Sequence, residues 1–330
     1  MTPSASILIV NFNSGSHLET CIESLKAQTF ENFEVILLDN ASSDNSLEKA
    51  KVATGDDVRF QLIEETSNLG FARGNNQAAE RTRADWIITL NPDAFPDPDW
   101  LANLLAAADA HPKIVHFGST QYVADEPEFL DGAGDRYFAA GIPWRDRSTA
   151  RIHLAQSKGH QTFETFSACA AAAMYSAEKF RTLGGFDERF FCFVEDVDLG
   201  FRLRLLGHPC LQVVNASVAH VGGGAGGGES DFARFYGTRN LIWCFAKNMP
   251  PPMLFALSPA VLAVLAILVL KALPRGNALT ILRAIVEASS GLSPVWRDRR
   301  KTAGARRVSI REIAGAMDWN PFIYLRTRHR

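Results

Sequence analysis

The chain has 330 residues, a hydrophobic content of 47% and a formal net charge of −2. This length suits one large domain or a domain with an appendage, and the hydrophobic content excludes a disordered protein. The small net charge argues against a general nucleic-acid binder, and five cysteines without CxxC spacing argue against a disulfide scaffold or a zinc cluster.

Strand and helix signals alternate through the first 120 residues. Strands are predicted at 6–10, 34–38, 58–63, 86–90 and 114–117, and helices at 16–25, 46–53, 72–83 and 99–110. Ser16 and Glu19 have the spacing of a capping box at the start of the first helix. Such alternation predicts a mostly parallel sheet with helices on both faces. The N-terminus shows no pattern of a secretory signal, and the cysteines favour a reducing compartment.

The periodicity fades between residues 122 and 162, where loops and short strands are expected to recognise an acceptor. In this stretch Trp144 and Arg145 are candidate sugar contacts, with an ordinary loop anchor as the alternative. A buried strand is predicted at 166–175 and another at 210–214. His220 and a glycine run at 222–228 follow, and the run suits a lid over a diphosphate.

Residues 184–208, GGFDERFFCFVEDVDLGFRLRLLGH, place Glu195, Asp196 and Asp198 within four positions beside an apolar run. Val197, Phe201 and Leu205 share one face of a predicted helix that stops near Gly207. The three acids, Glu195, Asp196 and Asp198, therefore lie at its N-terminus, where the helix dipole favours ionised carboxylates. Asp198 is spaced to reach Arg202 at i,i+4. This arrangement suits a general base, and the alternative is that the acids only cap and solvate the helix.

The C-terminal region changes character. About seventeen residues at 254–270 are uncharged, which is borderline for a spanning helix. A basic stretch follows at 297–311, with one acid, Asp298. An apolar segment followed by a basic one predicts attachment to an anionic membrane surface, and a buried hairpin with a solvated tail is the alternative.

Polar residues follow three predicted strands, at Asn11-Phe12-Asn13, Asp39-Asn40 and Asn91-Pro92-Asp93. Ligands bind beyond the carboxyl ends of strands in open α/β sheets, so the three clusters predict one composite cleft. The turn after the first strand reads NFNSGSH, which lacks the GxGxxG of dinucleotide binders, and the chain has no GxxxxGK[ST] loop. Asp93 and His220 offer ligands for Mg²⁺ or Mn²⁺ beside a diphosphate.

The chain resembles the inverting GT-A glycosyltransferases of family 2, close to the bacterial rhamnosyltransferase-like branch. The resemblance covers about residues 6–247 and is carried, in order, by VNFNSGSHLETCIESLKAQTF, ILLDNASSDNS, NLGFARGNNQA, LNPDAFPDPDWL, the 184–208 segment, VAHVGG and FYGTRNLIW. It implies a GT-A fold with a Rossmann-like sheet in residues 1–248, with a nucleotide-sugar half to about 120 and an acceptor half after it. Residues 249–330 are expected to form a helical membrane-associating region.

The resemblance also implies roles for individual residues. Asp196 matches the acceptor-activating base, and Asp93 and His220 match metal ligands, with Asn91 in place of the first Asp of the DxD motif. Asp39 is expected at the nucleotide base, with Phe12 close to the same ring. The full set of implied nucleotide-sugar contacts is Phe12, Asp39, Asn76, Asn91 and Asp93, with Glu195, Asp198 and Arg202 in support.

The implied activity is transfer of a sugar from a nucleotide-sugar donor to a glycan or lipid-linked acceptor, in cell-surface polysaccharide synthesis. dTDP-rhamnose is the favoured donor and a UDP-hexose the alternative. The expected location is the cytoplasmic face of a bacterial membrane, and association into homo-oligomers is left open. Two other readings are a nucleotidyltransferase, which NFNSGSH disfavours because it lacks a Gly- and Arg-rich phosphate loop, and a non-catalytic sugar-nucleotide or glycan-binding module.

Overall fold

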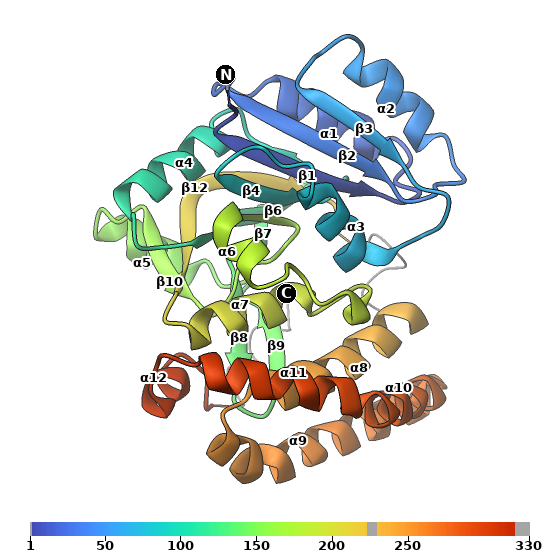
Figure 1. Cartoon of the computed structure of the whole chain (residues 1–330), viewed down its shortest axis with the longest axis vertical. Helices are drawn as coiled ribbons and strands as arrows, with labels where there is room; N and C mark the ends of the chain where they lie inside the picture. Colours follow the sequence, from blue (N-terminus) through green and yellow to red (C-terminus); the bar gives the residue numbers. More distant parts are fainter. Residues whose placement is uncertain (1, 223–229, 321–330) are drawn as a thin grey trace.

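The computed structural model describes residues 2–222 and 230–320. A central sheet carries helices on both faces, and a group of C-terminal helices packs at the end far from β2 and β3 (Figure 1). Most of the glycine run at 222–228, with its predicted lid role, lies outside the described residues.

The central sheet has one dominant strand order. That order is β10 (Thr162–Thr165), β12 (Cys210–His220), β6 (His116–Val123), β11 (Ala172–Ser176), β4 (Trp86–Leu90), β1 (Ala5–Asn11), β2 (Phe33–Asp39) and β3 (Phe60–Glu64). Two further strands extend it, because β5 (Ala94–Pro96) pairs with β12 and β7 (Glu126–Gly132) pairs with β6. The hairpin β8 (Asp135–Phe138) and β9 (Ile142–Arg145) stands apart.

The first half of the sheet is parallel, as the sequence predicts, because β1 pairs in parallel with both β2 and β4, and β2 with β3. Beyond β4 the sheet is mixed, since β11 runs antiparallel to β4 and β6. Parallel neighbours need a crossover connection, usually a helix, and β11 is instead reached through the β8–β9 hairpin and β10.

Two apolar clusters bind the helices to the sheet. One joins Ile7, Ile9 and Leu37 to α1 (His17–Lys26), α2 (Ser46–Thr54) and α4 (Trp100–Ala110). The other joins Leu8 and Ile36 to α3 (Gly70–Ala79), α6 (Ala177–Thr182) and α7 (Glu195–Leu205). The alternation of side chains along β1 sends Leu8 to one face and Ile7 and Ile9 to the other, which builds a three-layer core.

Helix α7 also faces a third cluster. Its residues Leu199 and Leu203 pack toward the sheet, whereas Val197, Phe201 and Leu205 pack against the C-terminal helices, so the predicted shared face is confirmed. Those helices are α8 (Asp231–Asn248), α9 (Pro251–Ala272), α10 (Ala278–Ser290), α11 (Leu292–Ala305) and α12 (Ile310–Gly315), with a short 3-10 turn η2 (Leu273–Arg275).

Two predicted strands differ from the structure in extent, and one predicted helix cap is wrong. The strand predicted at 166–175 is regular only from Ala172, because the chain at 166–171 turns toward the site described below. The strand predicted at 210–214 runs on to His220 across a bulge. Ser16 makes no capping hydrogen bond, since its backbone is already helical and a cap requires an extended conformation. The stretch at 122–162, where loops and short strands are predicted, contains β7 and the β8–β9 hairpin, and in addition the helix α5 (Ala150–Ser157).

Candidate active site

The predicted strand-end residues lie at neighbouring carboxyl ends, because β1 lies between β2 and β4. Asn11 donates from Nδ2 to Oδ1 of Asp39 at 2.7 Å, and the backbone N–H of Ser42 donates to Oδ2 of Asp39 at 3.1 Å. These bonds fix the orientation of a buried carboxylate at the sheet edge. Phe12, the next residue after β1, is 41% exposed, as an open aromatic platform would be.

Asp93 and His220 come together because β5 pairs with the end of β12. His220 Nε2 lies 3.5 Å from Oδ1 of Asp93 and 3.5 Å from Nδ2 of Asn91. The other ring nitrogen, Nδ1, lies 2.8 Å from Oδ2 of Asp131. Sequence reasoning missed Asp131, because nothing in the irregular 122–162 stretch marks it.

His220 and its two neighbouring carboxylates, Asp93 and Asp131, shift one another's pKa values. Burial alone would lower the pKa of His220, but Asp131 and Asp93 outweigh it and raise that pKa. Burial alone would raise the pKa of Asp93, and the hydrogen bond and charge of His220 lower it. A carboxylate on the remote ring nitrogen is the arrangement that orients a metal-ligating histidine, so Asp131 supports Nε2 as the donor atom.

The residues present fit a divalent cation held jointly with a diphosphate. No group of three or more His, Cys, Asp and Glu side chains is arranged to hold a metal within residues 2–222 and 230–320. Asp93 and His220 provide an oxygen and a nitrogen donor. Mg²⁺ and Mn²⁺ commonly complete their coordination with phosphate oxygens and waters, so two protein ligands suffice.

Asp196, the second residue of α7, lies beside the same strand ends. One carboxylate oxygen accepts from the N–H of Ala170 at 2.9 Å, and the other from the N–H of Val197 at 2.8 Å. The neighbouring Ala171 accepts at its carbonyl from the N–H of Asn91 at 2.9 Å. Asp196 and the Asn91-Pro92-Asp93 turn are therefore fastened to the same short segment of backbone.

Arg145 lies between Asp131 and the backbone segment that binds Asp196. Its guanidinium donates to Asp131 and lies 2.8 Å from the Sγ of Cys169, one residue before the partner of Asp196. Gly132 makes room for it, because a Cβ there would lie 2.2 Å from the Arg145 side chain. The predicted sugar contact thus lies between the Asp131–His220 pair and Asp196.

A cavity of about 800 Å³ lies against Asp196, Arg145 and Asn91, and Asp93, Asp131 and His220 are not among its lining residues. Its polar end is lined by Asn91, Asp135, Arg145, Glu195 and Asp196. Burial raises the pKa of Asp196, against the stabilising N–H groups of Ala170 and Val197. Burial and the nearby charge of Asp196 raise the pKa of Asp135 to about 8, and they raise that of Glu195 well above its usual value.

The backbone entering α7 is strained. Phe191, Phe193 and Val194 have φ angles of 62°, 71° and 69°, a left-handed conformation that is a genuine outlier for a β-branched residue. Asn240 of α8 holds this loop, with its Nδ2 within 2.9 Å of the carbonyls of residues 190, 192 and 193. The RN pair of the FYGTRNLIW motif therefore fixes the position of Glu195 and Asp196 from the opposite side.

Asp198 points away from the cavity. Arg202 Nε donates to Asp198 at 2.8 Å, which is the predicted i,i+4 contact, and Lys247 and Asn248 donate to it at 2.9 and 2.7 Å. Burial alone would raise the pKa of Asp198, but Lys247 and Arg202 lower it. Asp198 is fully buried and not solvated, so it anchors α7 while Asp196 faces the cavity.

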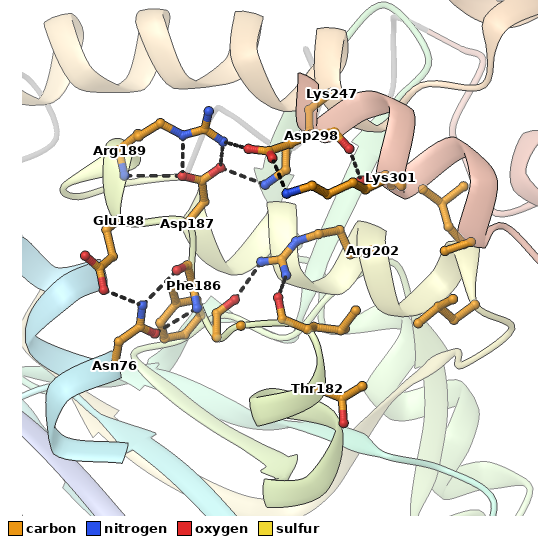
Figure 2. Close-up of a pocket in the computed structure, with 17 residues that line it drawn as sticks. Asn76, Thr182, Phe186, Asp187, Glu188, Arg189, Arg202, Lys247, Asp298 and Lys301 are labelled. Carbon is orange, nitrogen blue, oxygen red and sulfur yellow. Dashed lines mark hydrogen bonds and ion pairs between the residues drawn. The ribbon is translucent and has the colours of Figure 1, made fainter. Parts of the chain in front are cut away.

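Asn76 also lies apart from the composite cleft. Figure 2 shows it in a second, charged cavity of about 490 Å³ between α3 and α11. Its amide donates to the carbonyl of Phe186 at 2.8 Å and accepts from the N–H of Phe186 at 2.9 Å. Both halves of the amide bind the loop that leads to α7, and the structure does not bring Asn76 to Asp93.

Solved structures with this fold are glycosyltransferases. GalNAc-T7, solved with UDP, GalNAc and Mn²⁺, aligns with a TM-score of 0.62 at 17% identity over 74% of this chain and 48% of that longer chain. The mannosyltransferase PcManGT from Pyrobaculum calidifontis, solved with GDP-Man and Mn²⁺, aligns with a TM-score of 0.57 at 18% identity over 96% and 84% of the two chains. The chain therefore has the GT-A fold.

The sequence defines the class further. The chain belongs to glycosyltransferase family 2, since the profile of "Glycosyl transferase family 2" matches residues 6–184, more than half of its length. It is 29% identical, over 67% of its length and 76% of the relative's, to the N-acetylglucosaminyl-diphospho-decaprenol L-rhamnosyltransferase of Mycobacterium tuberculosis (strain CDC 1551 / Oshkosh). It is also 30% identical, over 66% of its length, to 17% of the O-antigen biosynthesis protein RfbC of Myxococcus xanthus. The predicted likeness to the rhamnosyltransferase-like branch is confirmed.

Proposed function

We propose that this glycosyltransferase moves a sugar, with inversion, from a nucleotide-sugar donor to a hydroxyl of a lipid-linked glycan acceptor. The observation that carries the proposal is the fastening of Asp196 and the Asn91-Pro92-Asp93 turn to one backbone segment, at Ala170 and Ala171. A general base and a diphosphate-binding site that are held by the same segment suit a single displacement, in which the acceptor oxygen attacks the anomeric carbon as the diphosphate leaves. The similar mycobacterial enzyme is named for L-rhamnose and a diphospho-decaprenol acceptor, so dTDP-rhamnose is our first donor, with a UDP-hexose as the alternative.

In the proposed reaction Asp196 takes the proton of the acceptor hydroxyl as that oxygen attacks the anomeric carbon. The bond to the nucleoside diphosphate breaks on the opposite face, which inverts the configuration. The N–H groups that Asp196 accepts from keep its carboxylate oriented, and burial makes it a stronger base than an exposed aspartate.

At the other side of the carbon, Asp39 and Phe12 would bind the nucleoside, and Asp93 and His220 would hold Mg²⁺ or Mn²⁺. When bound, such a cation neutralises charge on the diphosphate. Asp131 keeps His220 turned toward Asp93. Arg145 brings a fixed positive charge close to both groups.

We assign residues 1–248 to the catalytic domain and residues 249–330 to a membrane-associating region at the cytoplasmic face. One helix in the described part of the chain, 251–275, is long and apolar enough to cross a membrane, and 22% of its most apolar window is buried. A stripe that includes Met253, Val261 and Leu265 packs in the protein core, whereas Phe255 and Leu262 are exposed. A helix held along one stripe suits an interfacial position better than a spanning one.

The test is turnover of a panel of nucleotide sugars with Mg²⁺ or Mn²⁺, read as released nucleoside diphosphate, for wild type and Asp196→Asn. We expect one donor to be used, and the variant to lose a factor of about 10² to 10⁴ in kcat while still binding nucleotide. Retention of more than about a tenth of the wild-type rate would overturn the role of Asp196. Nucleotide binding without turnover by wild type, even with lipid-linked acceptor supplied, would favour a non-catalytic sugar-nucleotide-binding protein.

A further inference from the structure

The cavity that holds Asp196 extends well beyond what a donor sugar and a hydroxyl require. Its far wall is apolar and consists of side chains from two C-terminal helices. These are Leu241 of α8 and Val264, Ile267 and Leu268 of α9. A pocket of about 800 Å³ that begins at a proposed base and ends on an apolar helix has room for an acceptor with an apolar tail.

Two cations line the same wall. Arg234 lies near the start of α8, where it pairs with Asp231 at 3.7 Å, and Lys271 lies in the last turn of α9. Both helices therefore contribute one positive charge beside the apolar lining. An apolar chain that carries a negatively charged diphosphate matches this combination.

Gly237 gives an independent indication that this space is used. It lies inside α8 and lines the cavity, although glycine inside a helix costs about 1 kcal/mol relative to alanine. A Cβ at this position would meet no heavy atom within 4 Å, so packing within the protein does not require glycine. Ala233 and Leu241 lie one turn before and one turn after it on the same face. The small residues Ala233 and Gly237 keep that end of the wall open.

The polar end supplies the other half of the site. Glu195 is 4% exposed, and its Oε2 has no hydrogen-bond partner among the residues that the structure describes. It lines the cavity beside Asp196. A buried carboxyl group without a partner is costly, and a sugar hydroxyl at this position would satisfy it.

We infer that the α8–α9 wall is the binding subsite for the polyprenyl diphosphate part of the acceptor. The prenyl chain packs on Val264, Ile267 and Leu268, the diphosphate lies near Arg234 and Lys271, and the attached sugar reaches Glu195 and Asp196. The inference rests on the proposed function and adds the position of the lipid. The exposed apolar residues of α9 next to the wall, such as Leu270, give the chain a continuous path from a membrane surface.

The test measures binding and does not depend on turnover. Farnesyl diphosphate is titrated into detergent-free full-length protein, with inorganic diphosphate and farnesol as the comparison probes. We expect wild type to bind farnesyl diphosphate at least about tenfold more tightly than inorganic diphosphate. Gly237→Phe should weaken that binding about tenfold or more, because its ring occupies the open wall, whereas the matched control Gly237→Ala should stay within about twofold.

Two further variants separate the two parts of the ligand. Ile267→Asn changes a half-exposed side chain that folding does not require, and it should weaken farnesyl diphosphate and farnesol alike. Lys271→Glu should weaken farnesyl diphosphate and leave farnesol unchanged. Equal affinity for inorganic and farnesyl diphosphate, or unchanged binding in folded Gly237→Phe and Ile267→Asn, would overturn the subsite. Asp196→Asn should bind farnesyl diphosphate like wild type. A failure of the proposed catalytic role therefore shows only in the turnover assay, and a failure of the subsite only in the binding assay.

Discussion

At the scale of single residues, Asp196 and Asp198 show how two neighbouring carboxylates on one helix take different tasks. Asp198 is balanced by Arg202 and Lys247, which lower its pKa, whereas Asp196 is held by backbone N–H groups in a cavity, where burial raises its pKa. Charge partners fix one group in the core, whereas the other has no ion-paired cation among the residues that the structure describes and stays basic. The sequence places both at a helix start but does not say which one faces solvent.

Asp135 provides a test of this electrostatic arrangement. Its pKa is raised to about 8 from an ordinary value of 3.8, so the folded state binds more protons than the unfolded state between those two values. The free energy of unfolding should therefore fall as pH rises from about 4 to about 8. In Asp135→Asn this contribution disappears, so the variant should match wild type at about pH 3.5, below the ordinary pKa of 3.8, and be increasingly more stable than wild type up to about pH 8.5.

Urea unfolding at a series of pH values measures this difference. Asp56→Asn, at an exposed carboxyl group, is the matched control and should follow the wild-type curve. Parallel curves for wild type and Asp135→Asn would contradict a neutral Asp135 in the folded protein.

At the scale of elements, α7 is held by ionic contacts that cross from the C-terminal helices. Lys247 of α8 donates to Asp198 at 2.9 Å. Figure 2 shows that Lys247 also donates to Asp187, at 2.8 Å, and that Asp187 pairs with Arg189, which reaches Asp298 of α11 at 2.6 Å. These contacts join the loop before α7, α7 itself and two later helices.

Lys247→Met should be strongly destabilising, since it leaves two buried carboxylates short of a cation. Breaking a buried pair from one side typically costs about 3–5 kcal/mol, and we expect a loss in this range in the free energy of unfolding. The double variant Lys247→Met, Asp198→Asn should lose less than the sum of the two single changes. Lys301→Met, at a side chain 84% exposed, should change stability by less than about 0.5 kcal/mol. Additive effects in the double variant would show that the contacts act independently.

Much at this scale follows from sequence pattern. The strands β1, β2 and β4, the helix that carries Asp196 and its i,i+4 pair could be predicted because they depend on local periodicity and short spacing. The position of Asp131 could not, because it meets His220 only through the pairing of β7 and β12 on either side of β6. The NLGFARGNNQA motif predicts Asn76 in the cleft. Its hydrogen bonds to Phe186, 110 positions away, depend instead on a tertiary contact that sequence spacing does not encode.

At the scale of the whole molecule, the C-terminal helices present large apolar side chains to the outside. Phe255, Leu262 and Leu273 are 75%, 66% and 58% exposed, and Arg275 and Arg283 are exposed nearby. Apolar side chains flanked by cations are the composition that binds anionic bilayers. We propose this surface as the place of the predicted attachment.

Replacing Phe255, Leu262 and Leu273 together by serine should weaken binding to vesicles that contain anionic lipid by about tenfold or more, because three exposed apolar contacts are lost. Co-sedimentation with vesicles measures it, and Val58→Ser, at an exposed valine remote from these helices, is the control. Wild-type binding should also weaken with added salt. A triple variant that sediments like wild type would contradict attachment through α9 and η2.

The position of α7 between the sheet and the C-terminal helices has a consequence for how such enzymes diversify. Val197, Phe201 and Leu205 face the C-terminal helices, while Leu199 and Leu203 face the sheet. The two faces of this one helix are therefore under separate packing constraints. A recombination event that exchanged residues after 248 for a foreign tail would have to reproduce the surface that α7 already fits. We therefore expect changes of acceptor in this lineage to arise by point substitution along the cavity wall, and not by exchange of whole segments.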